Sequence, residues 1–163
     1  MKRILFLLAF VPALICAQDE VKFMGIPICY TYEQLTTELS KKLTKKHVNE
    51  IETDFTGTFA GIDECDISVV RNDSGYVDQI IVMKNLWYKS ADVPTLKLMY
   101  DDKYGNPIDV DNRDKEIVTY TYRMGETMIN FMIEFDKYNP SKTIGFDIFY
   151  FPRKYRGFST DDI

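Results

Sequence analysis

The sequence predicts an α+β fold built from two units in tandem, each a helix followed by three antiparallel strands. A helical pattern of apolar residues occurs twice, and each time three runs of alternating apolar and polar residues follow it. Short turns join the runs, so neighbouring strands should pair antiparallel. We place the units at residues 31–88 and 89–152, with the helices packed on one sheet face. Alternatively, all strands join one large sheet with both helices on the same side.

The first unit follows a lead arm at residues 18–30, where Pro27 permits an edge strand or an extended segment. Thr31 and Gln34 match a capping box, which marks the start of a helix. Leucines at four-residue spacing then predict a helix over residues 32–46 with one buried stripe. These leucines are Leu35, Leu39 and Leu43. Three strands are expected at residues 51–60, 63–71 and 76–86.

The second unit opens with Asp92 as the expected cap of a helix and Pro94 in its first turn. Gly105 suits the left-handed residue that ends this helix. The apolar residues spaced for burial are Val93, Leu96, Met99, Tyr100 and Tyr104. Strands are expected at residues 116–124, 127–136 and 143–151, and residues 153–163 form a polar tail.

Residues 1–17 have the organisation of a secretory signal peptide. Lys2 and Arg3 precede an apolar run, and Ala17 is a small residue where a signal peptidase would cut. The run is too short to anchor the chain in a membrane. We therefore expect a periplasmic or secreted protein. A lipoprotein signal ending at Cys16 is the alternative, which bulky Ile15 disfavours.

The charge of the chain argues against some partners. The net charge is −5, and loss of Lys2 and Arg3 with the leader brings it to −7. An acidic surface repels phosphate backbones, so no nucleic acid is expected as a partner. No apolar run in the mature chain approaches the roughly 20 residues that a transmembrane helix needs.

Three short phrases carry a resemblance to a known group of proteins. They are FMGIPI at residues 23–28, FTGTFAG at 55–61 and KYGNP at 103–107. In this order they resemble small exported proteins of unknown function from anaerobic gut bacteria. This resemblance implies an exported α+β domain without enzymatic activity. The duplicated helix-plus-sheet outline is also similar to the fold of β-lactamase inhibitory protein, an analogy of fold that transfers no function.

The search for catalytic and metal sites leaves few candidates. His47 is the sole histidine of the chain, so any Ser-His-Asp catalytic triad would have to include it. We expect no catalytic residue and no cofactor. Asp109, Asp111 and Asp114 begin like a calcium loop, but Arg113 stands where a ligand belongs. A solvated loop is the alternative explanation.

Two pairs of carboxylates share a strand face in the way that a glycosidase would need. The pairs are Glu64 with Asp66 and Glu134 with Asp136. Each pair falls on the polar side of an alternating strand, so exposure to solvent also explains it. Cys29 and Cys65 could form a disulfide between the lead arm and the second strand. Equally, Cys65 could be a buried thiol in line with Ile67.

Aromatic residues near the end of the chain suggest a binding surface. Phe149 and Phe151 point away from the expected core of the last strand, and rings and cations follow them. The candidate binding residues are Phe149, Phe151, Tyr155, Arg153 and Arg156. The alternative is that a second layer, such as the other unit or the lead arm, covers these rings.

The function that these observations favour is non-catalytic: an exported domain that binds a protein or a component of the cell envelope. The runner-up is a carbohydrate-active hydrolase or a sugar-binding module, in which carboxylates and aromatic rings would be reused. A third possibility is a structural role in an oligomer. An enzyme should show two carboxylates facing each other in a cleft, at least one of them shielded from water.

Overall fold

The computed structural model describes residues 21–86 and 93–152, and within them the fold is mostly β. The predicted α+β class is therefore wrong. Ten strands and two helices are present in this part of the chain. The expected signal peptide, the tail and the cap residue Asp92 lie outside the described residues.

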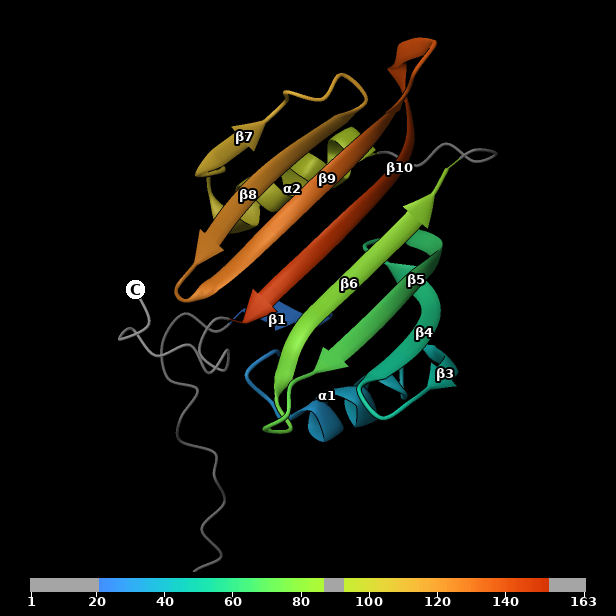
Figure 1. Cartoon of the computed structure of the whole chain (residues 1–163), viewed down its shortest axis with the longest axis vertical. Coiled ribbons are helices and arrows are strands. Elements are labelled where there is room, and N and C mark those ends of the chain that lie inside the picture. The colour runs from blue at the N-terminus through green and yellow to red at the C-terminus, as the bar shows by residue number, and fades with distance from the viewer. Residues whose placement is uncertain (1–20, 87–92, 153–163) are drawn as a thin grey trace, which may run out of the picture.

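Eight strands form one continuous antiparallel sheet, in the order β3-β4-β5-β6-β10-β9-β8-β7 (Figure 1). The first four strands follow one another in sequence, and so do the last four. The two sets meet where β6 and β10 lie side by side in the middle of the sheet. The bounds are β3 Thr44–Val48, β4 Glu52–Phe59, β5 Ile62–Arg71, β6 Val77–Asn85, β7 Asp109–Asp111, β8 Ile117–Met124, β9 Thr127–Asp136 and β10 Asn139–Pro152.

Each helix precedes four strands of the sheet, so the predicted helix-plus-three-strand units are wrong. The two strands that the sequence did not predict are the edge strands β3 and β7. Both are short, charged and largely exposed, so they lack the apolar alternation that marks a strand. Their backbone pairing with β4 and β8 makes them strands. Charged side chains on such edges discourage pairing with other chains.

Helix α1 spans Tyr32–Leu39 and is shorter than the predicted helix at residues 32–46. The capping box is confirmed: the Gln34 N–H donates to Thr31 Oγ1 at 3.3 Å, and the Thr31 N–H donates to Gln34 Oε1 at 3.1 Å. The helix ends at Ser40, whose hydroxyl donates back to the Thr36 carbonyl at 2.7 Å. Leu43 is still buried as predicted, although it lies in the turn after the helix.

Helix α2 spans Val93–Tyr104. Gly105 ends it as predicted, with φ +78° and an N–H that donates to the Asp101 carbonyl at 2.9 Å. Of the predicted stripe, Val93, Leu96 and Tyr100 are buried and Tyr104 is half-buried. Met99 is 51% exposed, so its predicted burial is wrong.

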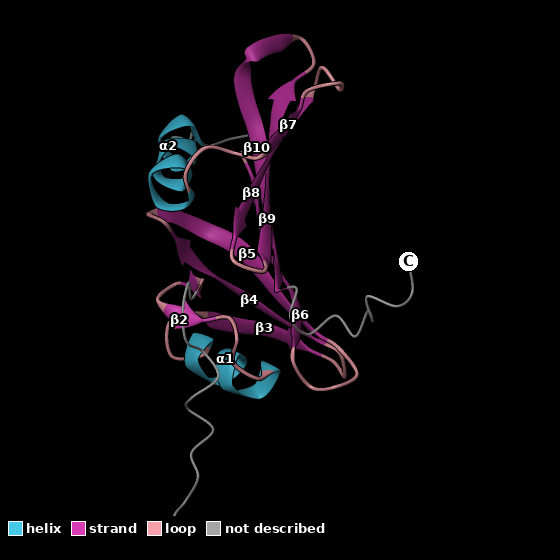
Figure 2. Cartoon of the chain, turned by 90° about the vertical axis from the view of Figure 1, so that its left-hand side faces the viewer, coloured by secondary structure: helices cyan, strands magenta, loops and turns pink. Residues whose placement is uncertain are grey.

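The core lies on one face of the sheet, and both helices cover that face (Figure 2). The alternative of one large sheet with both helices on the same side is therefore confirmed. Strand pairing aligns one buried row across the sheet, which runs through Phe55, Ile67, Val82, Ile148 and Phe131. Buried residues from both helices join this row in a single cluster.

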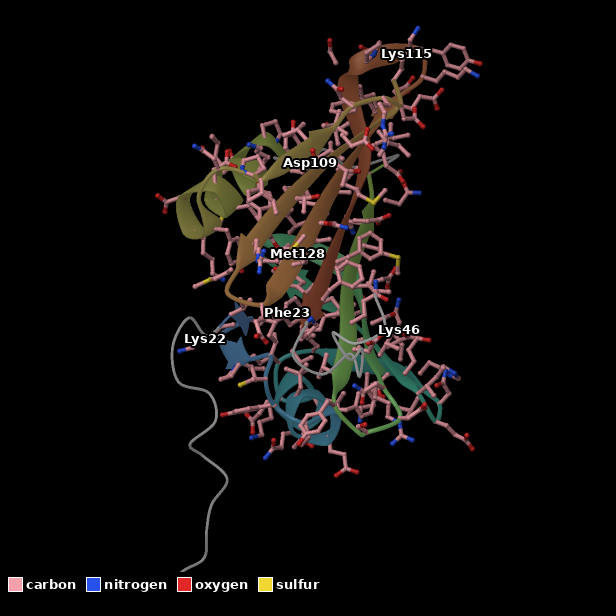
Figure 3. The ribbon with its side chains drawn as sticks, turned by 60° about the vertical axis from the view of Figure 1, so that its left-hand side comes forward. Lys22, Phe23, Lys46, Asp109, Lys115 and Met128 are labelled. Atoms are coloured by element: carbon pink, nitrogen blue, oxygen red, sulfur yellow. The ribbon has the colours of Figure 1, made fainter. Side chains whose placement is uncertain are left out.

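The lead arm forms a hairpin of β1, Lys22–Phe23, and β2, Ile26–Pro27. Phe23 is fully buried, stacks on Phe59 at 5.6 Å between ring centroids and meets Tyr150 edge-on at 5.4 Å. In Figure 3, Phe23 points towards the sheet while neighbouring Lys22 projects outwards. The hairpin thus bridges β4 and β10, which belong to different halves of the sheet.

Alternate residues of β9 should respond differently to truncation. Phe131 is fully buried against Tyr100 and Phe146, so Phe131→Ala should lower the free energy of unfolding by about 3–5 kcal/mol. Met132→Ala, one residue along on the opposite face, should lower it by less than about 1 kcal/mol. Urea denaturation followed by circular dichroism measures both. Equal losses would contradict the assignment of the two faces.

Candidate functional site

The face of the sheet opposite the helices carries the aromatic residues that the sequence suggested for binding. Phe149 and Phe151 both lie there on β10, half-buried and stacked at 6.2 Å between ring centroids. No helix or strand within the described residues covers this face (Figure 2). The other three candidates, Arg153, Tyr155 and Arg156, lie outside the described residues.

Strand register places further apolar side chains beside the two phenylalanines. Phe149 pairs with Ile81 on β6, and Phe151 pairs with Met128 on β9. Asp147 lies two residues before Phe149 on the same face and pairs with Met83 on one side and Met132 on the other. Met83 is 38% exposed and the rest are half-buried. We name this group the open-face strip: Ile81, Met83, Met128, Met132, Phe149 and Phe151. Aromatic and methionine side chains are enriched in protein interfaces, and contiguous exposed apolar patches mark interaction sites.

Sequence reasoning missed the aliphatic part of this strip. Along β9, Met128 and Met132 alternate with buried Ile129 and Phe131 on the side that also carries Asn130 and Glu134, so the pattern of this strand alone predicts a polar face. The signal that finds them is the pairing register, since β6 and β9 flank β10. That register is invisible from any one strand alone.

Carboxylates border the open-face strip. On one side, Asp66 of β5 pairs with Met83. On the other side, Thr119 of β8 pairs with Met132, and Asp111 of β7 pairs with Thr119. Asp54 and Asp109 occupy the neighbouring row. Two of these carboxylates are ion-paired: Asp66 with Lys46 at 2.6 Å, and Asp111 with Arg113. The strip is therefore an apolar surface whose border is acidic beside β4, β5 and β7 and basic at Arg123, the cross-strand partner of Met128.

Asp147 is a carboxylate within the strip itself. Its partial burial, and then the negative charge of Glu134, raise the pKa of Asp147 above its ordinary value. Its neighbours across the strands are Met83 and Met132, which offer no hydrogen bond of the strength a carboxylate finds in water. Ionised Asp147 therefore destabilises the fold, which is typical of functional sites.

The acidic loop does not form a calcium site among the described residues. Arg113 Nη2 and Nε bind Asp111, and this guanidinium lowers the pKa of Asp111 to about 2. Asp114 accepts the Glu116 N–H at 2.8 Å, as in a turn. No group of three potential ligands that could hold a metal ion occurs in the described part of the chain. The loop is held by its own arginine.

The carboxylate pairs that suggested a glycosidase do not converge. Glu64 lies 3.8 Å from the ammonium of Lys84, whereas Asp66 binds Lys46. Asp136 accepts the Tyr138 and Asn139 N–H groups at 2.8 and 3.1 Å, so it closes the β9–β10 turn. The acidic neighbours that do interact are Glu134 and Asp147, a pair that the sequence did not indicate.

The sequence allowed Cys65 either to form a disulfide with Cys29 or to be a buried free thiol, and the structure contains the free thiol. Cys65 is fully buried and free, so it is not bridged to Cys29. Burial raises the pKa of its thiol above the ordinary value, and the Sγ lies 3.4 Å from the Ile62 carbonyl. A protonated, buried thiol is a packing residue with little reactivity. His47, the single histidine, is exposed on edge strand β3 opposite Asp54.

Comparisons with protein-family models, with curated proteins and with solved structures gave no match. The resemblance to small exported proteins therefore stays a prediction. No helix in the described residues is long and apolar enough to cross a membrane.

Replacement of Asp147 should stabilise the protein in a pH-dependent way. Because the folded-state pKa is raised, its ionisation favours the unfolded chain as the pH rises through that value. Asp147→Asn should therefore raise the free energy of unfolding at pH 7, on the order of 0.5 kcal/mol. The gain should vanish near pH 3, where wild-type Asp147 is protonated in both states.

Thermal unfolding at pH 3, 5 and 7 measures the effect, with Asp109→Asn on edge strand β7 as the control. A gain that persists unchanged at pH 3, or that Asp109→Asn reproduces, contradicts this role of Asp147.

Proposed function

We propose that this protein is a non-catalytic, exported binding domain, and that the open-face strip is its contact surface for a partner protein. One observation carries the proposal: six apolar side chains gather on the uncovered face of a sheet whose other face carries the core. A sheet buries a second apolar face only against another layer. The described residues provide no such layer, so we infer that a partner does.

The acidic border indicates what the partner looks like. Asp54, Asp109 and Asp147 lie in or beside the strip, and their charge is complementary to lysine and arginine. We therefore propose a protein whose apolar contact surface is bordered by basic side chains. A second copy of this chain would bring like charges together, and an anionic lipid surface would be repelled by a net charge of −5.

Site-specific cross-linking in producing cells tests the proposal. A photo-cross-linking amino acid at Met83, in the strip, should yield an adduct with a second protein. The same amino acid at Leu98, 64% exposed on α2, should not, and it serves as the control. The linked peptide of the partner should be apolar and rich in lysine or arginine.

Phe149→Ser should reduce the adduct yield at Met83 by about 30-fold, the effect expected when an aromatic anchor worth about 2 kcal/mol is lost. Equal yields from Met83 and Leu98 would sink the proposal. An adduct between two copies of this chain would favour the structural role in an oligomer.

Binding to a basic partner should weaken in acid. As the pH falls from 7 to 4, Asp147 is protonated before ordinary aspartates because its pKa is raised. Affinity for the cross-linked partner, measured by titration calorimetry, should begin to fall at a higher pH for wild type than for Asp147→Asn. Identical pH profiles for the two proteins contradict a role for Asp147 in partner recognition.

A carbohydrate-active hydrolase is the second candidate, and the coupling of Asp147 to Glu134 favours it. A carboxyl whose pKa is raised by burial and by a neighbouring acidic residue is the kind of group that serves as a general acid. Hydrolysis of chromogenic glycosides that Asp147→Asn and Glu134→Gln both abolish would support this candidate. Retained cross-linking with no hydrolysis would support the binding domain.

A further inference from the structure

A pocket of about 220 Å³ lies on the helix side of the sheet, where the two halves of the fold meet. The turn of the β1–β2 hairpin and the β4–β5 turn form one wall, and α2 forms the other. Tyr150 of β10 reaches it from the sheet. At roughly 30 Å³ per water molecule, the space would hold about seven waters, or a ligand of about seven to ten non-hydrogen atoms.

Tyrosine hydroxyls give the pocket buried polar groups. Tyr100 and Tyr150 hydrogen-bond to each other through their hydroxyls, and burial raises the pKa of both, so both stay protonated. The Tyr104 hydroxyl is buried as well; it lies close enough to the Tyr150 hydroxyl to help raise the pKa of Tyr150, but among the described residues it has no partner at hydrogen-bond geometry. A buried hydroxyl in this state is an available donor for a ligand oxygen.

Two lysines, Lys22 and Lys103, line the same pocket. The Lys103 ammonium lies 4.8 Å from the centre of the Tyr104 ring. One carboxylate can therefore contact the Lys103 ammonium and the Tyr104 hydroxyl together. None of the described lining residues is acidic, although the chain as a whole has a net charge of −5. The pocket is a local basic site on an acidic protein, which favours an anion.

The remaining lining of the pocket is mostly apolar, and two of its residues have a strained backbone conformation. Met24 and Ala60 have φ values of 51° and 50°, in two-residue turns whose second residues are Gly25 and Gly61. Asparagine or aspartate is favoured at the first position of such turns, because a positive φ strains other side chains. Both turns instead carry an apolar residue that lines this pocket. Strain retained at two turns in one wall of the pocket points to use of that pocket.

We propose that this pocket binds a small monocarboxylate with an apolar body. Its carboxylate contacts Lys103 and accepts the Tyr104 hydroxyl proton in a hydrogen bond, and its apolar body packs among Met24, Phe59, Leu96 and Met99. Such a carboxylate occurs on free organic or short fatty acids and at the C-terminus of a peptide. The site lies on the face opposite the open-face strip and is independent of it.

Calorimetry with matched probes on the mature chain tests the charge requirement. Octanoate should bind at least about tenfold more tightly than 1-octanol, and octylamine should not bind. N-acetyl-alanine, which is within the size of ligand that the pocket holds, separates the two sources, with its amide as the uncharged control: tighter binding of the acetylated amino acid than of octanoate assigns a peptide C-terminus, and the reverse assigns a free acid. Equal binding of octanoate, octanol and octylamine overturns the proposal.

Substitutions in the lining locate the binding. Lys103→Met keeps the length of the side chain and removes its charge, so it should weaken octanoate by about tenfold and leave octanol unchanged. Met99→Trp should fill the space and abolish binding of both probes. Lys137→Met, in the exposed β9–β10 turn at the other end of β10, is the control and should change neither. Melting temperatures verify that each variant is folded.

Octanoate affinity that Lys103→Met leaves unchanged, or that Met99→Trp leaves unchanged in a folded protein, overturns the assignment of the site. Tyr104→Phe should weaken octanoate a few-fold without lowering the melting temperature, because its hydroxyl has no protein partner to lose.

Discussion

The antiparallel pairing of β6 with β10 is the contact on which the rest of the molecule depends. It joins two four-stranded meanders, each of which ends at this seam, into one sheet. Its register sets Val82 opposite Ile148 and Ile81 opposite Phe149. Because side chains alternate along a strand, a slip of one residue would exchange the buried row for the exposed one. The seam therefore decides which side of the sheet is core and which is left open.

The charges of the sheet follow from its layout. Both edges carry charged side chains: Lys45 and Lys46 on β3, Asp109 and Asp111 on β7. Charged edges hinder the addition of further strands, so a partner meets a face more readily than an edge. On the open face, carboxylates lie around the apolar side chains, and two of them, Asp66 and Asp111, form ion pairs with Lys46 and Arg113. This arrangement gives a partner an apolar centre and a border that selects its charge.

Periodicity predicted what is local in this fold and failed where the cause is distant. The alternation of β9 correctly separates Phe131 from Met132, and the capping box and Gly105 correctly locate helix ends. The edge strands β3 and β7 exist because β4 and β8 pair with them, a cause that no local pattern records. The helical spacing of the leucines predicts that the first helix includes Leu43. In the structure α1 ends at Leu39, and Leu43 is buried although it lies in the turn that follows. Likewise, Phe149 is identifiable from β10 alone, but Met83 and Met132 join it through pairing.

Two places in this fold combine a binding surface with local departures from the most stable arrangement. On the open face, Asp147 sits between two methionines with a raised pKa. At the pocket, Met24 and Ala60 hold positive φ values and the Tyr104 hydroxyl has no protein partner. Sequences tend to keep such departures where function requires them. Strand β10 contributes to both places, with Tyr150 on one side and Phe149 and Phe151 on the other. Because these side chains point in opposite directions, a change at either site leaves the lining of the other intact, and the two sites can be dissected separately.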